Sequence, residues 1–188
     1  MIETAKLQSI LERPELRKGL QTYQTIMEAF PETDVSKDKA FQKLYRDFYQ
    51  MRPFYTDDFA SAYFRLMEKM KTWLPVSFDM AFERIKHIKG SYEISFSSKM
   101  VHTIDPNLPI WDKIVTGEHF HMKAPYCSCR NRERVCCRRY EDYRKRFCSY
   151  TDSPEGQMLI ESFDAAFPDS GISDVKKIDF ILWQDRKI

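Results

Sequence analysis

Apolar residues recur every three or four positions along most of the chain, and strict alternation of apolar and polar residues is almost absent. Spacing of three and four places side chains on one face of an α-helix, whereas alternation is typical of a half-buried β-strand. In residues 36–51, one such stripe is formed by Phe41, Leu44, Tyr45 and Phe48. The pattern therefore predicts an all-α protein.

Prolines, one glycine and several capping residues divide this pattern into separate helices. Breaks are expected at Pro14, Pro31 and Pro75, because proline lacks the N–H that a helix interior needs, and Gly90 is a typical C-terminal stop. Helix starts are expected at the capping residues Thr56, Ser77, Ser153 and Ser173. The predicted helices cover residues 5–12, 15–30, 36–51, 57–73, 77–90, 94–104, 131–150, 154–167 and 173–185, with a short helix from about 112 and an irregular segment over 116–130.

The chain contains no internal repeat and no low-complexity linker that would separate domains. One compact all-helical domain over residues 1–188 is the simplest prediction. The alternative is a division into two lobes around a cleft, with residues 1–75 and the C-terminal helices in one lobe and residues 76–150 in the other.

Composition narrows the class of protein. Apolar residues make up 43% of the 188 residues and charged residues 31%, with only 5 glycines, which is typical of a soluble, helix-rich protein. No apolar run approaches the roughly 20 residues needed to cross a bilayer, and the first residues do not resemble a signal peptide. We therefore expect a cytoplasmic protein without membrane contact, in which the five cysteines are reduced.

Positive charge is concentrated in residues 123–146. This segment carries nine basic and three acidic residues, a net charge of +6, which leaves −4 for the rest of the chain because the total is +2. Such asymmetry favours contact with an anion such as DNA, although a solvated helix face would show the same run. Tyr140, Tyr143 and Phe147 recur at three and four and are expected to form the buried stripe of this helix. The candidate DNA-binding residues are Arg130, Arg132, Arg134, Arg138, Arg139 and Lys145.

Histidine and cysteine residues just before the basic helix offer a weaker, metal-binding hypothesis. The residues concerned are His119, His121, Cys127 and Cys129. Both types of side chain suit zinc, but only one residue separates the members of each pair, fewer than the two to four of usual zinc pairs. We expect no metal and no cofactor.

The stretch "SSKMVHTIDPNLPIWDKIV" (97–115) combines a helix, two prolines and an acid. On a helical wheel Ser98, Lys99 and His102 fall on the half opposite the apolar residues of 94–104, so Lys99 should face outward or into a cleft. Asp112 follows the prolines and is expected to be the N-cap of the next helix. The positive end of that helix favours a negative charge there, so a cap could also act as a catalytic carboxylate.

A helix containing Ser-Lys, an irregular turn and then Pro-Ile-x-Asp resembles the core of the helix–hairpin–helix DNA glycosylase superfamily, over residues 85–115. The resemblance implies an enzyme that removes a base flipped out of duplex DNA. Asp112 would be the catalytic carboxylate, and Lys99 would match the lysine of members that also cleave the strand. Trp111, His102 and Ser98 would be candidates for lining the cleft. The hairpin of the superfamily contains a glycine turn, and Gly90 is the glycine of the corresponding region here.

Two functional hypotheses follow. The first is a DNA-binding protein that resembles a base-excision glycosylase and removes or recognises a flipped base. The second is a non-catalytic helical module with a glycosylase-like scaffold that binds nucleic acid or a protein through residues 123–146. DNA is the expected partner under the first hypothesis.

Overall fold

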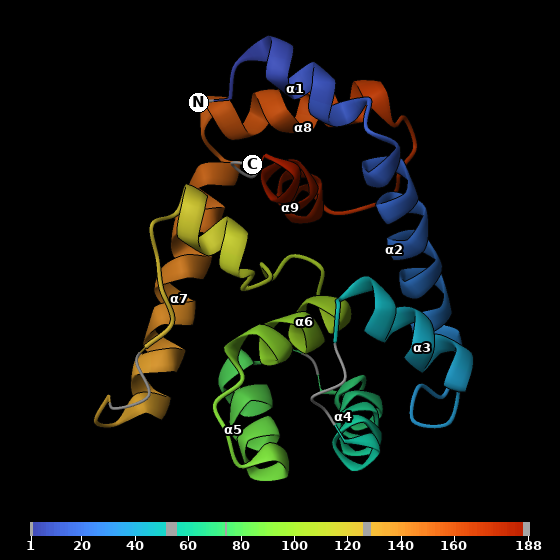
Figure 1. Ribbon diagram of the computed structural model, residues 1–188, viewed down its shortest axis with the longest axis vertical. Coiled ribbons are helices and arrows are strands. Elements are labelled where there is room, and N and C mark those ends of the chain that lie inside the picture. The colour runs from blue at the N-terminus through green and yellow to red at the C-terminus, as the bar shows by residue number, and fades with distance from the viewer. Residues whose placement is uncertain (1, 52–55, 74, 126–128, 186–188) are drawn as a thin grey trace. The chain divides into compact units, whose positions relative to one another are not determined.

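The computed structural model describes residues 2–51, 56–73, 75–125 and 129–185, and across these ranges the chain forms helices and connecting segments with no β-strand (Figure 1). The all-α prediction is therefore confirmed. The α-helices are α1 (Thr4–Leu11), α2 (Pro14–Glu32), α3 (Lys39–Phe48), α4 (Asp57–Met70), α5 (Phe78–Lys89), α6 (Ile94–Ile104), α7 (Arg132–Thr151), α8 (Pro154–Ala166) and α9 (Asp174–Gln184), and a π-helical turn, η1 (Val115–His119), follows α6.

The chain falls into two compact units. Unit 1 comprises Met1–Arg17 and Pro106–Ile188, and unit 2 comprises Lys18–Asp105, so α2 begins in unit 1 and continues in unit 2. These boundaries are not those of the two lobes considered from the sequence, 1–75 with the C-terminal helices and 76–150.

Unit 1 is organised around α9, which contacts α1, α7, α8 and η1. Figure 1 shows α1 beside α8, although almost the whole chain separates them in sequence. Its core includes fully buried Ile10 of α1, Tyr143 of α7, Phe163 of α8 and Ile181 of α9. The apolar stripes of these helices therefore meet in one core, which is the main stabilising contribution expected for such a unit.

Burial of α9 extends further than its sequence pattern predicts. The spacing of Val175, Ile178, Ile181 and Leu182 predicts one buried face, but Lys176 and Asp179 are buried as well, with 3% and 6% of their surfaces exposed. The predicted docking face is confirmed by the burial of Ile178, Ile181 and Leu182, and burial reaches beyond it because α1, α7, α8 and η1 all contact the helix. The two charged side chains form an ion pair with each other, which offsets the free-energy cost of removing them from water.

Unit 2 has an aromatic core built from α3, α4, α5 and α6. Tyr45 and Tyr63 are completely buried, and their hydroxyls are 3.1 Å apart. The Tyr63 hydroxyl also donates to the Phe96 carbonyl at 3.0 Å. Burial raises the pKa of Tyr45 well above its usual range. Both hydroxyls therefore stay protonated and serve as buried hydrogen-bond donors.

Several helices begin at the predicted caps. The hydroxyl oxygens of Thr56, Ser153 and Ser173 accept from backbone N–H groups of the first helical turn, at 3.2, 3.1 and 3.2 Å. Ser77 occupies the N-cap position of α5 but makes no side-chain cap hydrogen bond. Gly90 ends α5 in the left-handed conformation, with φ of 74°, as the glycine stop predicts.

Several predicted bounds were wrong, and the helix predicted over residues 36–51 is shorter at both ends, Lys39–Phe48. The second helix continues through Pro31 to Glu32, because a proline in the last turn removes only one terminal hydrogen bond. The segment 116–130 is not irregular throughout, since residues 115–119 form η1. Thr116 stabilises this turn by donating its N–H and its hydroxyl to the Asp112 carbonyl, at 2.9 and 2.6 Å.

In the ranges given above, no helix combines the length and the hydrophobicity needed to cross a membrane.

Candidate functional site

Asp112 lies at the start of the short helical segment that ends with η1, within unit 1. Its Oδ1 atom accepts from the N–H of Ile114 at 2.8 Å and more weakly from that of Val115 at 3.4 Å. The predicted capping role is therefore confirmed. The carboxylate satisfies amide donors that the first turn of a helix leaves without partners.

The second carboxylate oxygen of Asp112 is not used for capping. Oδ2 accepts no hydrogen bond from any residue that the structure describes. The side chain is half-buried, so it is neither sealed in the core nor fully solvated. One oxygen thus fixes the orientation of the carboxylate, and the other remains open to a water molecule or a ligand.

Two tyrosines of α7 hold the Pro-Ile-Trp-Asp segment from the other side. The Tyr140 hydroxyl donates to the Pro109 carbonyl and the Tyr143 hydroxyl to the Ile110 carbonyl, each at 3.0 Å. Tyr140 and Tyr143 are 2% and 0% exposed, and Phe147 completes the buried stripe with 1%. The sequence predicted this stripe but not the hydrogen bonds, which position the residues immediately before Asp112.

Trp111 and Tyr143 pack edge to face beside Asp112, with ring centroids 5.4 Å apart. Trp111 is only 4% exposed, so in this structure its ring belongs to the packing of unit 1. Burial raises the pKa of Tyr143 well above its usual range, and the nearby charges of Asp179 and Asp112 raise it further. Tyr143 is therefore a neutral hydrogen-bond donor throughout the physiological pH range.

Helix α9 carries a buried charged pair that was not predicted from the sequence. Lys176 Nζ lies 2.6 Å from Asp179 Oδ2, and it also sits 4.5 Å from the centre of the Phe180 ring. The spacing of three between a lysine and an acid on a helix was the available signal. Such pairs are usually solvent-exposed, and the spacing alone does not indicate burial here.

Lys99, the second predicted catalytic residue, belongs to α6 in unit 2. Its Nζ atom donates to the Tyr49 carbonyl at the C-terminal end of α3, at 3.1 Å. It also lies over the rings of Phe96 and Tyr49, 5.2 and 5.7 Å from their centres. A helix C-terminus and two aromatic faces all favour the charged ammonium form, which is not nucleophilic.

The other two residues considered for the cleft on α6 are buried. Ser98 and His102 are both 0% exposed, so the helical wheel was wrong in setting them opposite the buried half. The Ser98 hydroxyl donates to the Ser95 carbonyl at 2.9 Å, and His102 Nε2 lies 3.0 Å from the Tyr23 hydroxyl. The prediction failed because α2 also covers this helix, through Tyr23.

The predicted site residues are thus divided between the units. Asp112 and Trp111 lie in unit 1, whereas Ser98, Lys99 and His102 lie in unit 2. Each group is ordered by contacts inside its own unit, and the local chemistry of each can be considered separately. Unit 1 contains the capping carboxylate of Asp112 with one open oxygen, and unit 2 contains the hydrogen-bonded ammonium group of Lys99.

Helices α5 and α6 are joined by a short turn and pack against each other. The turn begins at Gly90, whose N–H donates to the Lys86 carbonyl at 2.7 Å. Ser91 and Glu93 stabilise it, because the Ser91 hydroxyl donates to Glu93 Oε1 at 2.9 Å. Two packed helices joined by a glycine turn are the geometry of a helical hairpin, immediately upstream of the segment that carries Asp112.

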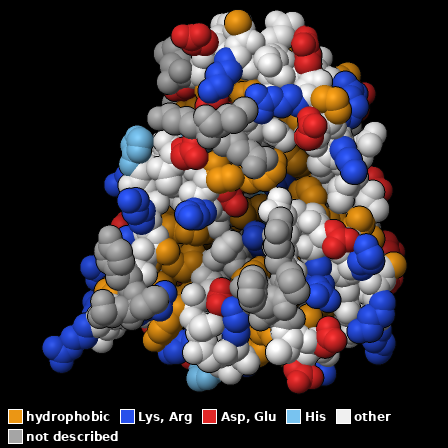
Figure 2. Space-filling view, in the orientation of Figure 1, with side chains coloured by type: hydrophobic (Ala, Val, Ile, Leu, Met, Phe, Trp, Pro, Cys, Tyr) orange, Lys and Arg blue, Asp and Glu red, His pale blue; other side chains and the backbone are white. Residues whose placement is uncertain are grey.

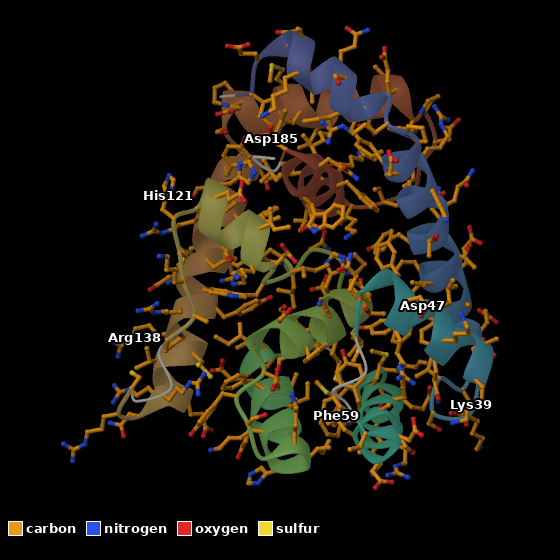
Figure 3. All side chains as sticks on the ribbon, in the orientation of Figure 1. Lys39, Asp47, Phe59, His121, Arg138 and Asp185 are labelled. Carbon is orange, nitrogen blue, oxygen red and sulfur yellow. The ribbon has the colours of Figure 1, made fainter. Side chains whose placement is uncertain are left out.

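The basic candidates divide by exposure. Arg130, Arg134, Arg138 and Lys145 are exposed. Arg132 and Arg139 are half-buried, and the guanidinium group of Arg139 donates to the Lys123 carbonyl. Figure 2 shows blue Lys and Arg side chains along the edge where Figure 1 places α7, and Figure 3 shows Arg138 projecting from that helix.

The metal hypothesis gains no support from the part of the chain that the structure describes. Cys127 lies outside the described residues, and within them no three His, Cys, Asp or Glu side chains are grouped as a metal ion would require. His119 Nε2 is 2.9 Å from the Leu182 carbonyl, His121 is exposed (Figure 3), and Cys129 Sγ is directed to the Arg130 carbonyl at 3.5 Å. His119 is therefore engaged in packing against α9.

Comparison of the chain with protein-family models, with curated proteins and with solved structures gives no match.

Proposed function

We propose that the protein binds duplex DNA and hydrolyses the N-glycosidic bond of a flipped base, with Asp112 as the catalytic carboxylate. The observation that carries this proposal is the state of that carboxylate. Oδ1 is fixed by two backbone N–H groups, while Oδ2 accepts no hydrogen bond from a described residue. A fixed carboxylate with one open oxygen is suited to stabilising a developing sugar cation or orienting water.

The chemistry expected of Asp112 is simple. As the bond between the base and the sugar lengthens, positive charge develops on the sugar ring, and the carboxylate stabilises it. Water then adds to the sugar carbon and gives up a proton, while the base leaves with the bonding electrons and is protonated. The two tyrosine hydrogen bonds to Pro109 and Ile110 keep the carboxylate in place, because they fix the backbone just before it.

Lys99 has no covalent role in this proposal. Its ammonium group is held by the Tyr49 carbonyl and by two aromatic rings. An amine must be neutral to attack a sugar carbon and form a Schiff base. We therefore propose base removal without strand cleavage, with Lys99 joining α6 to the end of α3.

DNA binding is proposed to involve the exposed cations of α7, within unit 1. Arg134 and Arg138 are exposed on the first half of α7. Exposed arginines contact phosphates without base specificity and release counterions on binding.

The direct test is a base-release assay on duplexes that each carry one damaged or mismatched base. Wild-type protein is expected to release one class of base, and Asp112→Asn is expected to reduce release by at least a hundredfold, because the transition state loses its charge partner. Lys99→Gln is expected to retain release. Borohydride is expected to trap no covalent complex between DNA and the wild type or either variant.

The controls separate the roles of these two residues. Borohydride trapping of the wild type that disappears in Lys99→Gln would contradict the assignment of a structural role to Lys99. Base release by Asp112→Asn at the wild-type rate would contradict the catalytic role of Asp112.

The second candidate function is a non-catalytic nucleic-acid-binding module. Four exposed basic residues favour this function, because binding DNA through them requires no catalytic carboxylate. They are Arg130, Arg134, Arg138 and Lys145. Salt-dependent DNA binding without base release on any duplex of the panel would select this function over the first.

A further inference from the structure

A groove of about 920 Å³ lies inside unit 2, between α3 and the first turns of α4. Its volume falls within the range of roughly 300–1,000 Å³ typical of small-molecule sites. It belongs to neither the Asp112 site nor the basic helix α7. The α3 side of the groove is lined by Lys39, Gln42, Lys43, Arg46, Asp47 and Gln50, and the α4 side by Asp57, Ala60 and Ser61.

Three cations line one wall of this groove. Lys39, Lys43 and Arg46 are spaced by four and three residues, so they lie on one face of α3. The opposite wall offers the small side chains of Ala60 and Ser61. A ligand that contacts both walls would therefore place a negatively charged group at the α3 wall and an uncharged part at the α4 wall.

The first of these cations is held in position by the protein. Lys39 Nζ donates to Gln42 Oε1 at 3.1 Å, and Gln42 Nε2 donates to the Val35 carbonyl at 2.8 Å. Gln42 is only 7% exposed, so its amide is a fixed support rather than a mobile surface group. Lys39 therefore loses less side-chain freedom when it binds an anion. Figure 3 labels Lys39 at the first residue of α3.

Arg46, like Lys39, is paired with no carboxylate of the described residues. Its half-buried guanidinium group makes no hydrogen bond or ion pair with any residue in the described ranges. Lys43, by contrast, is paired with Asp47 at 2.6 Å. Guanidinium presents a planar fork of donors that matches the oxygens of a phosphate. Arg46 and Lys39 are thus the two groups available to a phosphate in this groove.

We propose that this groove binds the phosphate ester of a nucleotide, either free or within a single strand. The phosphate contacts Arg46 and Lys39, and the sugar and base extend along the wall of Ala60 and Ser61. Asp47 is occupied by Lys43 and so does not oppose the anion directly. Asp57 also lines the groove, on the side of α4, and so favours placement of the phosphate at the α3 wall.

The test is a calorimetric titration of the full chain with deoxyadenosine monophosphate, a short single-stranded oligonucleotide, adenosine and inorganic phosphate. At least one of the first two is expected to bind. Adenosine and inorganic phosphate are expected to bind at least about tenfold more weakly, because each lacks half of the recognised group. Whichever of the first two binds more tightly identifies whether the phosphate is free or part of a strand.

Variants locate the site. Lys39→Gln/Arg46→Gln is expected to weaken binding about tenfold or more, since charge-assisted hydrogen bonds are lost. Arg46→Gln alone is a second variant that keeps every described hydrogen bond of the protein. The matched control is Lys18→Gln/Lys69→Gln, which removes the same charge from exposed positions of unit 2 outside the groove and is expected to bind as the wild type.

The proposal is overturned if neither the nucleotide nor the strand binds, if adenosine or inorganic phosphate binds as tightly as the nucleotide, or if the groove and control variants behave alike. Its outcome is independent of the proposed base excision. Base release that persists in Lys39→Gln/Arg46→Gln leaves the glycosylase proposal intact. Nucleotide binding without base release leaves the groove proposal intact.

Discussion

At the scale of single residues, Asp112 combines a structural and a proposed chemical role. The structural role is measurable on its own, because asparagine caps a helix about as well as aspartate, whereas alanine does not. We expect Asp112→Ala to lower the free energy of unfolding by about 1 kcal/mol and Asp112→Asn to change it little. Urea denaturation followed by circular dichroism measures both.

The comparison separates the cap from the catalyst. If both variants are equally destabilised, the carboxylate contributes through its charge rather than through capping geometry. A stable but inactive Asp112→Asn variant is the combination that the proposed function requires.

His119 links stability to pH. Burial lowers its pKa below the ordinary value of 6.5, although Asp185 and the Leu182 carbonyl partly offset this. The folded state therefore binds the proton less readily than the unfolded state, so the stabilising contribution is full above pH 6.5 and is lost as the pH falls through the folded-state pKa. We expect the free energy of unfolding to fall between about pH 8 and about pH 5.5, the range in which histidine titrates.

His119→Gln should reduce this pH dependence, because glutamine does not titrate and can still donate to the Leu182 carbonyl. Urea denaturation at the two pH values measures the difference. His87→Gln is the control, since His87 is exposed on α5. An unchanged pH dependence in His119→Gln would show that another group carries it.

At the scale of elements, the junction of α7 and α8 is set by a glycine. A Cβ atom at Gly156 would lie 2.0 Å from the Tyr150 carbonyl oxygen and 2.8 Å from that of Thr151. The backbone cannot move aside without disturbing the end of α7. We expect Gly156→Ala to lower the free energy of unfolding by roughly 1–3 kcal/mol or more, as overpacking does.

Gly117 provides the matched control for this substitution. It lies in η1, and a Cβ atom there would have nothing within 4 Å. Gly117→Ala is therefore expected to be neutral or to stabilise by about 0.4–1 kcal/mol, through the entropy of the unfolded chain. Equal effects of the two substitutions in thermal or urea denaturation would contradict the close approach at Gly156.

Some helix boundaries could be predicted from the sequence, whereas the burial of several polar side chains could not. The bounds of α6 and α8 follow from prolines and caps, which are local signals, and both were predicted within one residue. The burial of Ser98, His102 and Lys176 was not predictable from spacing, because it depends on how many neighbours cover a helix. For the candidate site, the capping role of Asp112 was local and predictable, whereas the hydrogen bonds of Lys99 and Tyr143 depend on tertiary packing.

At the scale of the whole molecule, the uneven distribution of charge leads to a prediction for DNA binding. Each phosphate contact in duplex DNA contributes about 0.9 to the slope of log affinity against log salt concentration. We expect Arg134→Gln/Arg138→Gln to reduce the slope by about 2 if both residues contact phosphates. Fluorescence anisotropy between about 50 and 200 mM salt measures it.

The charge-matched control is again Lys18→Gln/Lys69→Gln, which leaves α7 unchanged. If both pairs reduce the slope equally, the protein binds DNA through its overall charge rather than through α7. If neither pair changes it, the cations of α7 form only a solvated helix face.

Unit 1 is built from two segments on either side of unit 2 in the sequence, which has a consequence for synthesis of the chain. Its helix α1 packs against α8 and α9, both of which follow unit 2 in the sequence. Chains emerge from the ribosome N-terminus first, and domains tend to fold as units once they are complete. All of unit 2 therefore leaves the ribosome while the apolar face of α1 still lacks its partners. A nascent chain stalled once residue 105 has emerged from the ribosome should contain a folded unit 2 and an α1 segment that is accessible to chaperones and proteases.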